Sequence, residues 1–325
     1  MLSQTLRRAD RWLFQPGDAR AVAALRVGLC GALCARLCRG IYVQWAQQAR
    51  GLYRPVSFMR LFPLPAPTAV VVLQVLGIAA CLLAIVGYRT RPSVLIAWAC
   101  SIVLIGMVVG FGRDAENEAP LLLALVPLLA ARSGDAWSVD SLLSKGHRAG
   151  RRLQSLHYGW PVRSTMVVVA GGYFFAGLAK VVWSGPAWIT SSNLRWILYT
   201  ASDAQRVPNR LGLSVADRPW LAHGVAAGAL ASEVLFPLAL WRPKLRWFFV
   251  PAVVLLHVGI WATMGLNYVA WATTTIVVFV DWVWVVDRWR QPLREDAVVP
   301  IAGNRRRGSD GRASLQAFAR GRHSH

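Results

Sequence analysis

Apolar residues along the chain gather in eight windows that are separated by short polar connections. A window of about twenty apolar residues can cross the hydrocarbon layer as a helix, because each residue advances about 1.5 Å. The pattern therefore predicts an all-α integral membrane protein with about eight transmembrane helices in one bundle. The windows are residues 21–43, 68–87, 93–111, 118–132, 161–183, 219–241, 246–264 and 267–286.

The fourth window, 118–132, is the shortest and contains two prolines. At about 1.5 Å per residue it extends roughly 22 Å, so it is either a kinked crossing or a re-entrant segment. If it did not cross, the basic stretch 145–152 would lie on the outer side, against the preference of Lys and Arg for the cytoplasmic side. The charges therefore favour a true crossing, with both termini in the cytoplasm.

The connections between the windows are too short to fold independently. The longest are 44–67, 133–160 and 184–218. We therefore expect a cytoplasmic N-terminal segment (1–20), one transmembrane domain (21–290) and a basic, disordered cytoplasmic tail (291–325). The first twenty residues are polar and basic, so no cleavable signal peptide is expected and the predicted location is the plasma (inner) membrane.

The net charge is +21, although 55% of the residues are hydrophobic. Most of the positive residues flank the apolar windows, where they favour correct insertion and contact with anionic lipid headgroups. Their position argues against nucleic acid as a partner. Membrane lipids are the expected partners, together with a peptide substrate or another membrane subunit.

Ionisable side chains at membrane depth are costly unless they are paired or reach the interface, so each is a candidate for function. Lys180 lies about three residues, roughly 5 Å, from the outer end of its window. Asn117 and Glu118 begin the fourth window at the same predicted level. Lys180 is therefore either a tuned base or ion-pair partner beside this acidic turn, or a lysine that snorkels to the interface beside Trp183 and Trp188.

Glu233 is predicted to lie too deep to meet Lys180, but near the level of Arg26 in the first window. These two residues are expected to form a neutralised ion pair that fixes helix packing. His257 falls near the middle of its window. It is either a satisfied polar contact between helices or part of a proton path.

Cys30, Cys34 and Cys38 recur every four residues on one face of the first window. The stripe fits either a metal or haem site or small residues that pack helix on helix. No second group of Cys or His at ligand spacing accompanies it, so no metal is predicted. The chain also lacks a phosphate-binding Gly-rich loop and a nucleophile elbow.

Four stretches in order are similar to those of one known family: Ala24–Leu29 (ALRVGL), Leu52–Val56 (LYRPV), Trp137–Asp140 (WSVD) and Tyr173–Lys180 (YFFAGLAK), followed by Trp183. Over residues 20–285 the chain resembles the HTTM (horizontally transferred transmembrane) family. That family includes the membrane part of vitamin K-dependent γ-carboxylase and the component that matures a sporulation-delaying peptide toxin.

The resemblance implies that Lys180 corresponds to the proposed base of vitamin K hydroquinone epoxidation, with a quinone or quinol as cofactor. A histidine of the carboxylase falls on Asn117, and an amide cannot perform a histidine's proton chemistry. The large lumenal region of the eukaryotic enzyme has no counterpart here. The chain is thus expected to be closer to the peptide-maturation relatives than to a carboxylase.

The resulting hypothesis is a bacterial multipass protein that modifies or matures a lipidic or peptide substrate at the outer face of the membrane. Lys180, Asn117 and Glu118 are the predicted catalytic residues, and Arg54, Trp183 and His257 are predicted to bind substrate. An enzyme of carboxylase or epoxidase type would use Lys180 as its base. The alternatives are a non-enzymatic scaffold or chaperone in a membrane complex and, third, a transporter.

Overall fold

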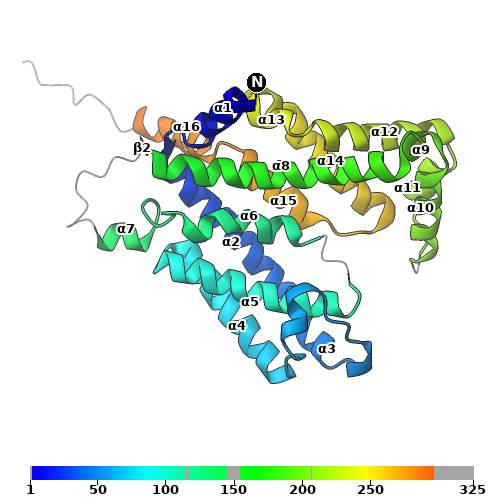
Figure 1. Ribbon diagram of the computed structural model, residues 1–325, viewed down its shortest axis with the longest axis horizontal. Coiled ribbons are helices and arrows are strands. Elements are labelled where there is room, and N and C mark those ends of the chain that lie inside the picture. Colours follow the sequence, from blue (N-terminus) through cyan, green and yellow to red (C-terminus); the bar gives the residue numbers. More distant parts are fainter. Residues whose placement is uncertain (1, 114–116, 145–153, 206, 296–325) are drawn as a thin grey trace, which may run out of the picture. The chain divides into compact units, whose positions relative to one another are not determined.

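The computed structural model describes residues 2–113, 117–144, 154–205 and 207–295, and most of these residues are helical (Figure 1). Five described helices are long and apolar enough to cross a membrane, and a sixth crossing is added if α15 (Val269–Phe279) and α16 (Trp282–Glu295) are one broken span. These apolar helices indicate a membrane-embedded protein. The five are α2 (Ala19–Arg39), α4 (Pro67–Val86), α5 (Thr90–Gly110), α8 (Leu156–Ser184) and α14 (Arg246–Met264), the last with the 3-10 turn η3 (Pro243–Leu245) before it.

Three of the predicted windows form shorter helices than expected. In the last, 267–286, α15 has 11 residues and α16 begins only at Trp282. The window 118–132 contains α6 (Ala119–Ala130), whose 12 residues extend only about 18 Å. The window 219–241 is divided into α12 (Pro219–Leu235) and α13 (Leu238–Trp241), because Pro237 has no N–H to continue the helical ladder. The predicted count of eight crossings in one bundle therefore remains a prediction.

The remaining elements are short. The strands β1 (Gly17–Asp18) and β2 (Gln154–Ser155) pair antiparallel, with Gly17 opposite Ser155, and join the N-terminal segment to the start of α8. The other helical elements are α1 (Leu2–Leu13), α3 (Tyr42–Ala46), η1 (Arg50–Leu52), η2 (Ser57–Leu61), α7 (Val139–Leu143), α9 (Ala187–Thr190), α10 (Asn193–Asp203) and α11 (Arg210–Ala216).

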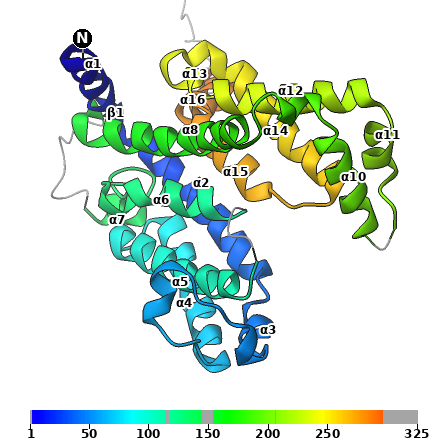
Figure 2. The same ribbon diagram turned by 45° about the vertical axis from the view of Figure 1, so that its right-hand side comes forward.

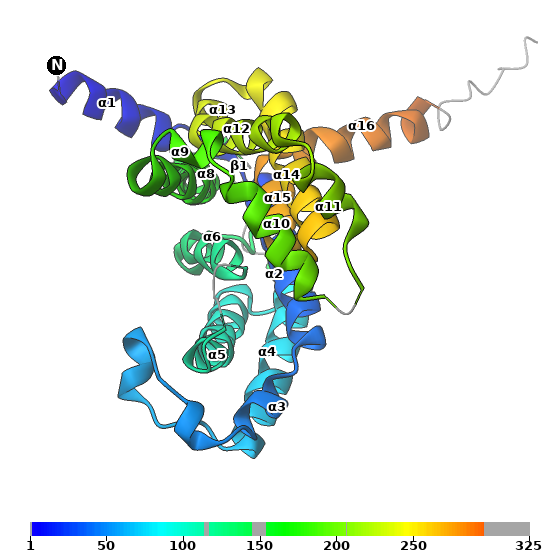
Figure 3. The same cartoon turned by 90° about the vertical axis from the view of Figure 1, so that its right-hand side faces the viewer.

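The described residues up to Val283 form one compact unit, and the described residues from Trp284 to Glu295 belong to a second. Within the first unit, α2 runs between two groups of helices (Figures 1 and 2). Helices α4 and α5 pack against each other and against one side of α2, whereas α8, α12, α14 and α15 gather on the other side, with α6 between the groups (Figure 3). The predicted basic tail lies outside the described residues from residue 296 onward.

Helix α2 ends at Arg39, four residues before the end of the predicted window, because its last carbonyls find a side-chain partner. The amide nitrogen of Gln74, in the middle of the apolar helix α4, donates to the carbonyls of Leu37 (2.8 Å) and Gly40 (3.1 Å). A polar side chain inside a membrane helix thus satisfies carbonyl groups that a helix end would otherwise leave unpaired.

Arg26 is fully buried, but its partners differ from the prediction. Its guanidinium donates to the backbone carbonyls of Ser133 and Trp137, which lie in the loop between α6 and α7. Trp137 has a left-handed backbone (φ 46°), a conformation that is uncommon for a bulky residue. The predicted ion pair of Arg26 with Glu233 is therefore wrong: Arg26 fixes a loop instead of pairing with a carboxylate on another helix.

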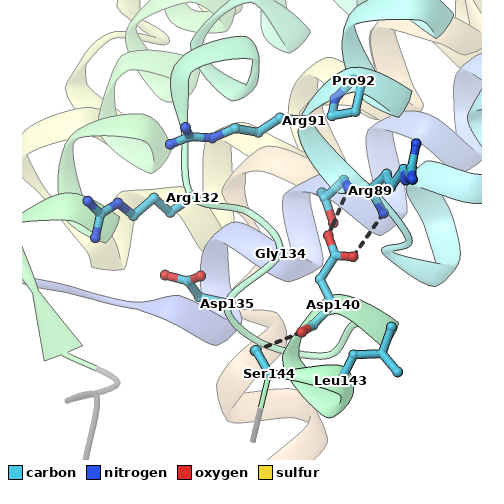
Figure 4. Close-up of a pocket in the computed structure, with 10 residues that line it drawn as sticks. Arg89, Arg91, Pro92, Arg132, Gly134, Asp135, Asp140, Leu143 and Ser144 are labelled. Carbon is cyan, nitrogen blue, oxygen red and sulfur yellow. Dashed lines mark hydrogen bonds between the residues drawn. The ribbon is translucent and has the colours of Figure 1, made fainter. Parts of the chain in front are cut away.

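The same loop connects to the start of α5 through Asp140, the last residue of the Trp-Ser-Val-Asp stretch. The Asp140 carboxylate accepts hydrogen bonds from the backbone nitrogens of Arg89 and Thr90, both at 2.8 Å, and from the Thr90 hydroxyl at 2.7 Å (Figure 4). It therefore caps α5 from a distant part of the chain. Burial acts to raise the pKa of Asp140, but the hydrogen bonds from Thr90 and Arg89 outweigh it and leave that pKa below its ordinary value of 3.8.

Candidate functional site

Lys180 lies one turn before the end of α8 and forms an ion pair with Glu233 of α12. Its Nζ lies 2.7 Å from one carboxylate oxygen of Glu233 and 2.6 Å from the other. The Lys180 side chain is 23% exposed and that of Glu233 is 11% exposed. The pair is thus mostly enclosed, but the ammonium group lies at the edge of the unit.

Gly177 explains how the two helices come close enough for this pair. A Cβ atom at Gly177 would lie 2.7 Å from Cγ2 of Val234 and 3.0 Å from Cβ of Glu233. Any larger residue would push α12 away from α8. The glycine of the Tyr173–Lys180 stretch therefore stands one turn before the lysine because α12 occupies the space of its side chain.

The prediction that Glu233 lies too deep to meet Lys180 is wrong for two physical reasons. The predicted window 219–241 puts the inner end of this span at residue 241, which places Glu233 about two turns inside the membrane. In the structure α12 ends at Leu235, only two residues after Glu233. In addition, the first turns of α12 pack against α9, α10 and α11, so α12 extends past the end of α8 before the two helices meet. The connection between the two windows is a helical cap and not a simple loop.

Trp188 of α9 completes the surroundings of the ammonium group. The Nζ atom of Lys180 lies 5.4 Å from the centroid of the Trp188 ring, within the range of a cation–π contact. The sequence had placed Trp183 in the substrate site, but its side chain is 86% exposed at the end of α8. Trp188, which the sequence predicts only as an interfacial residue, is the tryptophan that contacts the lysine.

Tyr173, two turns before Lys180 on the same face of α8, is at the centre of a buried polar cluster. Its hydroxyl lies 3.0 Å from Nε2 of His257 (α14) and 2.9 Å from the hydroxyl of Thr275 (α15). The ring of Trp271 packs edge-on at 4.9 Å. The predicted residue His257 is therefore part of this cluster.

Asn117 and Glu118 belong to a different place in the unit. Glu118 is buried and accepts from Nε of Arg36 at 2.7 Å, and the other contact of this ion pair, from Nη2, is also 2.7 Å. Asn117 and Glu118 line a cavity of about 520 Å³ that Lys180 does not line. The prediction that these two residues set the proton affinity of Lys180 is wrong, because Arg36 holds Glu118 and Glu233 holds Lys180.

Arg54 is exposed in the segment after η1, where its backbone nitrogen donates to the Gly110 carbonyl at 2.7 Å. The neighbouring Tyr53 packs so closely on Gly110 that a Cβ there would lie 2.3 Å from its ring. The Leu52–Val56 stretch thus fastens a loop to the end of α5. No contact found in the described chain brings Arg54 to Lys180.

No model of a protein family, no curated protein and no solved structure matches this chain. The resemblance to the HTTM family therefore remains a prediction that rests on its four sequence stretches. Within residues 2–113, 117–144, 154–205 and 207–295, no group of three or more His, Cys, Asp or Glu side chains could hold a metal ion.

Tyr173, Trp188 and Thr275 are the site residues that the sequence did not indicate. A signal for Tyr173 existed, because residues seven apart lie on one face of a helix and Tyr173 opens the stretch that Lys180 closes. Trp188 and Thr275 come from other elements. Their place beside α8 follows only from the packing of α9 and α15.

Proposed function

We propose that the chain crosses the plasma membrane eight times with both termini in the cytoplasm, and that it modifies or matures a lipidic or peptide substrate at the outer face. The proposal retains the resemblance to the HTTM family that the four sequence stretches indicate. It assigns the chemistry to Lys180 together with Glu233, in place of Asn117 and Glu118. The observation that supports it best is the contact of the Lys180 ammonium with both oxygens of Glu233 at the edge of the unit.

A lysine can act as a base only as the neutral amine. Glu233 is placed to accept the proton of Lys180, which converts the ion pair into a neutral amine and a carboxylic acid. In a site of low dielectric the neutral form of such a pair gains in relative stability, because neither partner then bears the cost of desolvation. The free amine could then take an acidic proton from a substrate. Once the Glu233 carboxylic acid has released its own proton to water at the exposed edge of the pair, the carboxylate would again stabilise the ammonium group.

The principal alternative is a scaffold in which the pair only holds α8 against α12. The close approach at Gly177 favours it, because the two helices are already packed at the level of the pair. The two functions differ in what they require of residue 180. A scaffold needs a cation that can pair with Glu233, whereas a base needs a side chain that can lose its proton.

Lys180→Arg separates these functions, because arginine keeps the charge and the carboxylate contact but does not deprotonate in proteins. We suggest expressing the wild type, Lys180→Arg, Lys180→Ala and the exposed-lysine control Lys244→Ala at equal membrane levels. Lipid and peptide extracts are then compared by mass spectrometry. We expect a product that is present with the wild type and with Lys244→Ala and that is absent from both Lys180 variants.

A product that persists in Lys180→Arg but not in Lys180→Ala would assign the pair to the scaffold. A product that persists in both Lys180→Arg and Lys180→Ala would show that Lys180 is not required for the function. Glu233→Gln serves as a further control, since it leaves the lysine without its proton acceptor. The base proposal requires Glu233→Gln to reduce the product at unchanged protein level.

A further inference from the structure

A second site is suggested by the cavity of about 520 Å³ between α2, α3, α6 and α15. Its volume lies within the range of small-molecule binding sites, roughly 300–1,000 Å³. Much of its wall is apolar, formed by side chains from five elements. The large apolar side chains of this wall are those of Ile41, Trp45, Val108, Leu121 and Val269.

The polar part of the same cavity is strongly basic. Among the described residues that line it, the three arginines Arg36, Arg39 and Arg113 lie with one carboxylate, that of Glu118. Glu118 is bound to Arg36, and in the described part of the chain neither Arg39 nor Arg113 has a carboxylate partner. The cavity therefore has two positive charges in excess beside an apolar wall.

Tyr42 supplies an unused polar group at this place. The residue is 1% exposed, and its hydroxyl has no hydrogen-bond partner among the described residues. Tyr42 lines the cavity, and the guanidinium carbon of Arg36 lies 5.5 Å from the centroid of its ring. Burial raises the pKa of the Tyr42 phenol, which keeps the hydroxyl protonated and able to donate. A buried hydroxyl without a partner is costly, and an oxygen of a ligand would satisfy it.

We infer that this cavity binds an amphiphile whose head carries a phosphate group. The head would lie between Arg39, Arg113 and the Tyr42 hydroxyl, and the chain would follow the apolar wall. Guanidinium groups bind phosphate oxygens through charge-assisted hydrogen bonds, and two excess positive charges match a phosphate monoester.

The proposed lipid site is separate from Lys180, because the helix α15 lies between them. Val269 and Thr273 of α15 line the cavity, whereas Trp271 and Thr275 contact Tyr173 on the other side. These two pairs of residues lie on different faces of the helix. The binding site therefore does not depend on the function proposed for Lys180.

The protein also contains a control for simple attraction of anions. A cavity of about 790 Å³ near the start of α5 is lined by Arg89, Arg91 and Arg132, but its wall also includes Asp135 and Asp140, and most of its lining residues are polar (Figure 4). Free phosphate could be attracted to either cavity. An amphiphile should select the one with an apolar wall.

The experiment uses the purified full chain in a neutral detergent without phosphate. Binding is measured for dioctanoyl phosphatidic acid, dioctanoylglycerol and inorganic phosphate by the shift of the thermal unfolding curve across a ligand titration. We expect phosphatidic acid to bind most tightly, because only it offers both the phosphate head and the chains. If dioctanoylglycerol binds as tightly as phosphatidic acid, the cavity does not recognise the phosphate head. If inorganic phosphate binds as tightly as phosphatidic acid, the cavity does not recognise the acyl chains. Either result would overturn the proposal.

Two variants locate the site. Tyr42→Phe removes a hydroxyl that has no partner in the described chain, so it should leave folding intact and weaken phosphatidic acid binding about 2- to 10-fold. Arg113→Gln should weaken it about 10-fold or more, as expected for a charged hydrogen bond. Arg91→Gln, in the polar cavity, should leave it unchanged. Equal affinity in Tyr42→Phe, Arg113→Gln and the wild type would overturn the proposal.

Discussion

Arg26 and Lys180 are both cations within the helical unit, and the protein neutralises them by different chemistry. Arg26 donates to two backbone carbonyls of one loop, and its surroundings leave it fully buried. Lys180 meets a carboxylate that can itself take up a proton, and its side chain remains 23% exposed. A backbone carbonyl cannot take up a proton in this way, so the first arrangement fixes structure while the second permits proton transfer.

The two residues also differ in what they join. Arg26 connects α2 to the loop before α7, and Asp140 of α7 in turn caps α5, so one arginine helps to fix the relation of three helical segments. Lys180 joins α8 to α12, which already touch at Gly177, and contacts Trp188 of the short helix α9. Loss of Arg26 should therefore damage folding more than loss of Lys180, and loss of Lys180 should damage function more.

The largest effect is expected for Arg26→Met. It leaves the carbonyls of Ser133 and Trp137 without a donor, at about 1–3 kcal/mol each, so the free energy of unfolding should fall by about 2–6 kcal/mol. Thermal unfolding in detergent, followed by tryptophan fluorescence, measures the loss. Arg39→Met, at the exposed end of the same helix, is the matched control and should change little.

Arg26→Lys sharpens the same test. One ammonium nitrogen cannot reproduce a guanidinium that reaches two carbonyls four residues apart, so the lysine variant should recover only part of the stability. Full recovery would show that charge alone matters and that the two hydrogen bonds do not.

A smaller loss is expected for Lys180→Met and for Glu233→Leu. Each single change leaves one charge of a mostly enclosed pair unpaired, and about 2–4 kcal/mol should be lost, at or below the range for fully buried pairs. Lys180→Met should be the worse of the two, because Glu233 is shorter and less exposed, whereas an unpaired lysine can reach the interface.

The double variant Lys180→Met with Glu233→Leu tests whether the pair is structural. Apolar residues in both positions leave no unpaired charge, so unfolding should return to within about 1 kcal/mol of the wild type. Lys244→Met, at an exposed position, is the control. If the loss in free energy of unfolding of the double variant equals the sum of the losses of the two single variants, the two residues are not coupled.

The sequence predicted the helical, membrane-embedded character well, because each apolar window fixes its own local structure. It could not predict where neighbouring helices meet. Counting depth assumed straight spans that begin at a common level, whereas Pro237 shortens α12 and the α9–α11 cap displaces its start. The partners of Arg26, Lys180 and Glu118 were therefore assigned wrongly, even though each had been identified as a charge in need of one.

The four short sequence stretches identified residues that make structural contacts, whereas the ion pairs predicted from membrane depth were wrong. Arg26 and the Trp137–Asp140 stretch are joined by hydrogen bonds, and Gly177 and Lys180 serve one contact with α12. Neither relation follows from spacing along the chain, since more than a hundred residues separate Arg26 from Trp137. Short stretches identified the residues, and only the packing of helices identified what they touch.

The smallest effect is expected for Asp140→Asn, at the far end of the loop that Arg26 fixes. The variant keeps an oxygen acceptor but loses the charge at the start of α5, so about 0.5–2 kcal/mol should be lost at neutral pH. The pKa of Asp140 is lower in the folded protein than its ordinary value of 3.8. Its contribution is therefore complete above about pH 4 and disappears as the pH falls through the lower, folded value. Unfolding curves of the wild type and Asp140→Asn should thus converge as the pH is lowered below 4, and a constant difference down to the lowest accessible pH would contradict this origin of the stability.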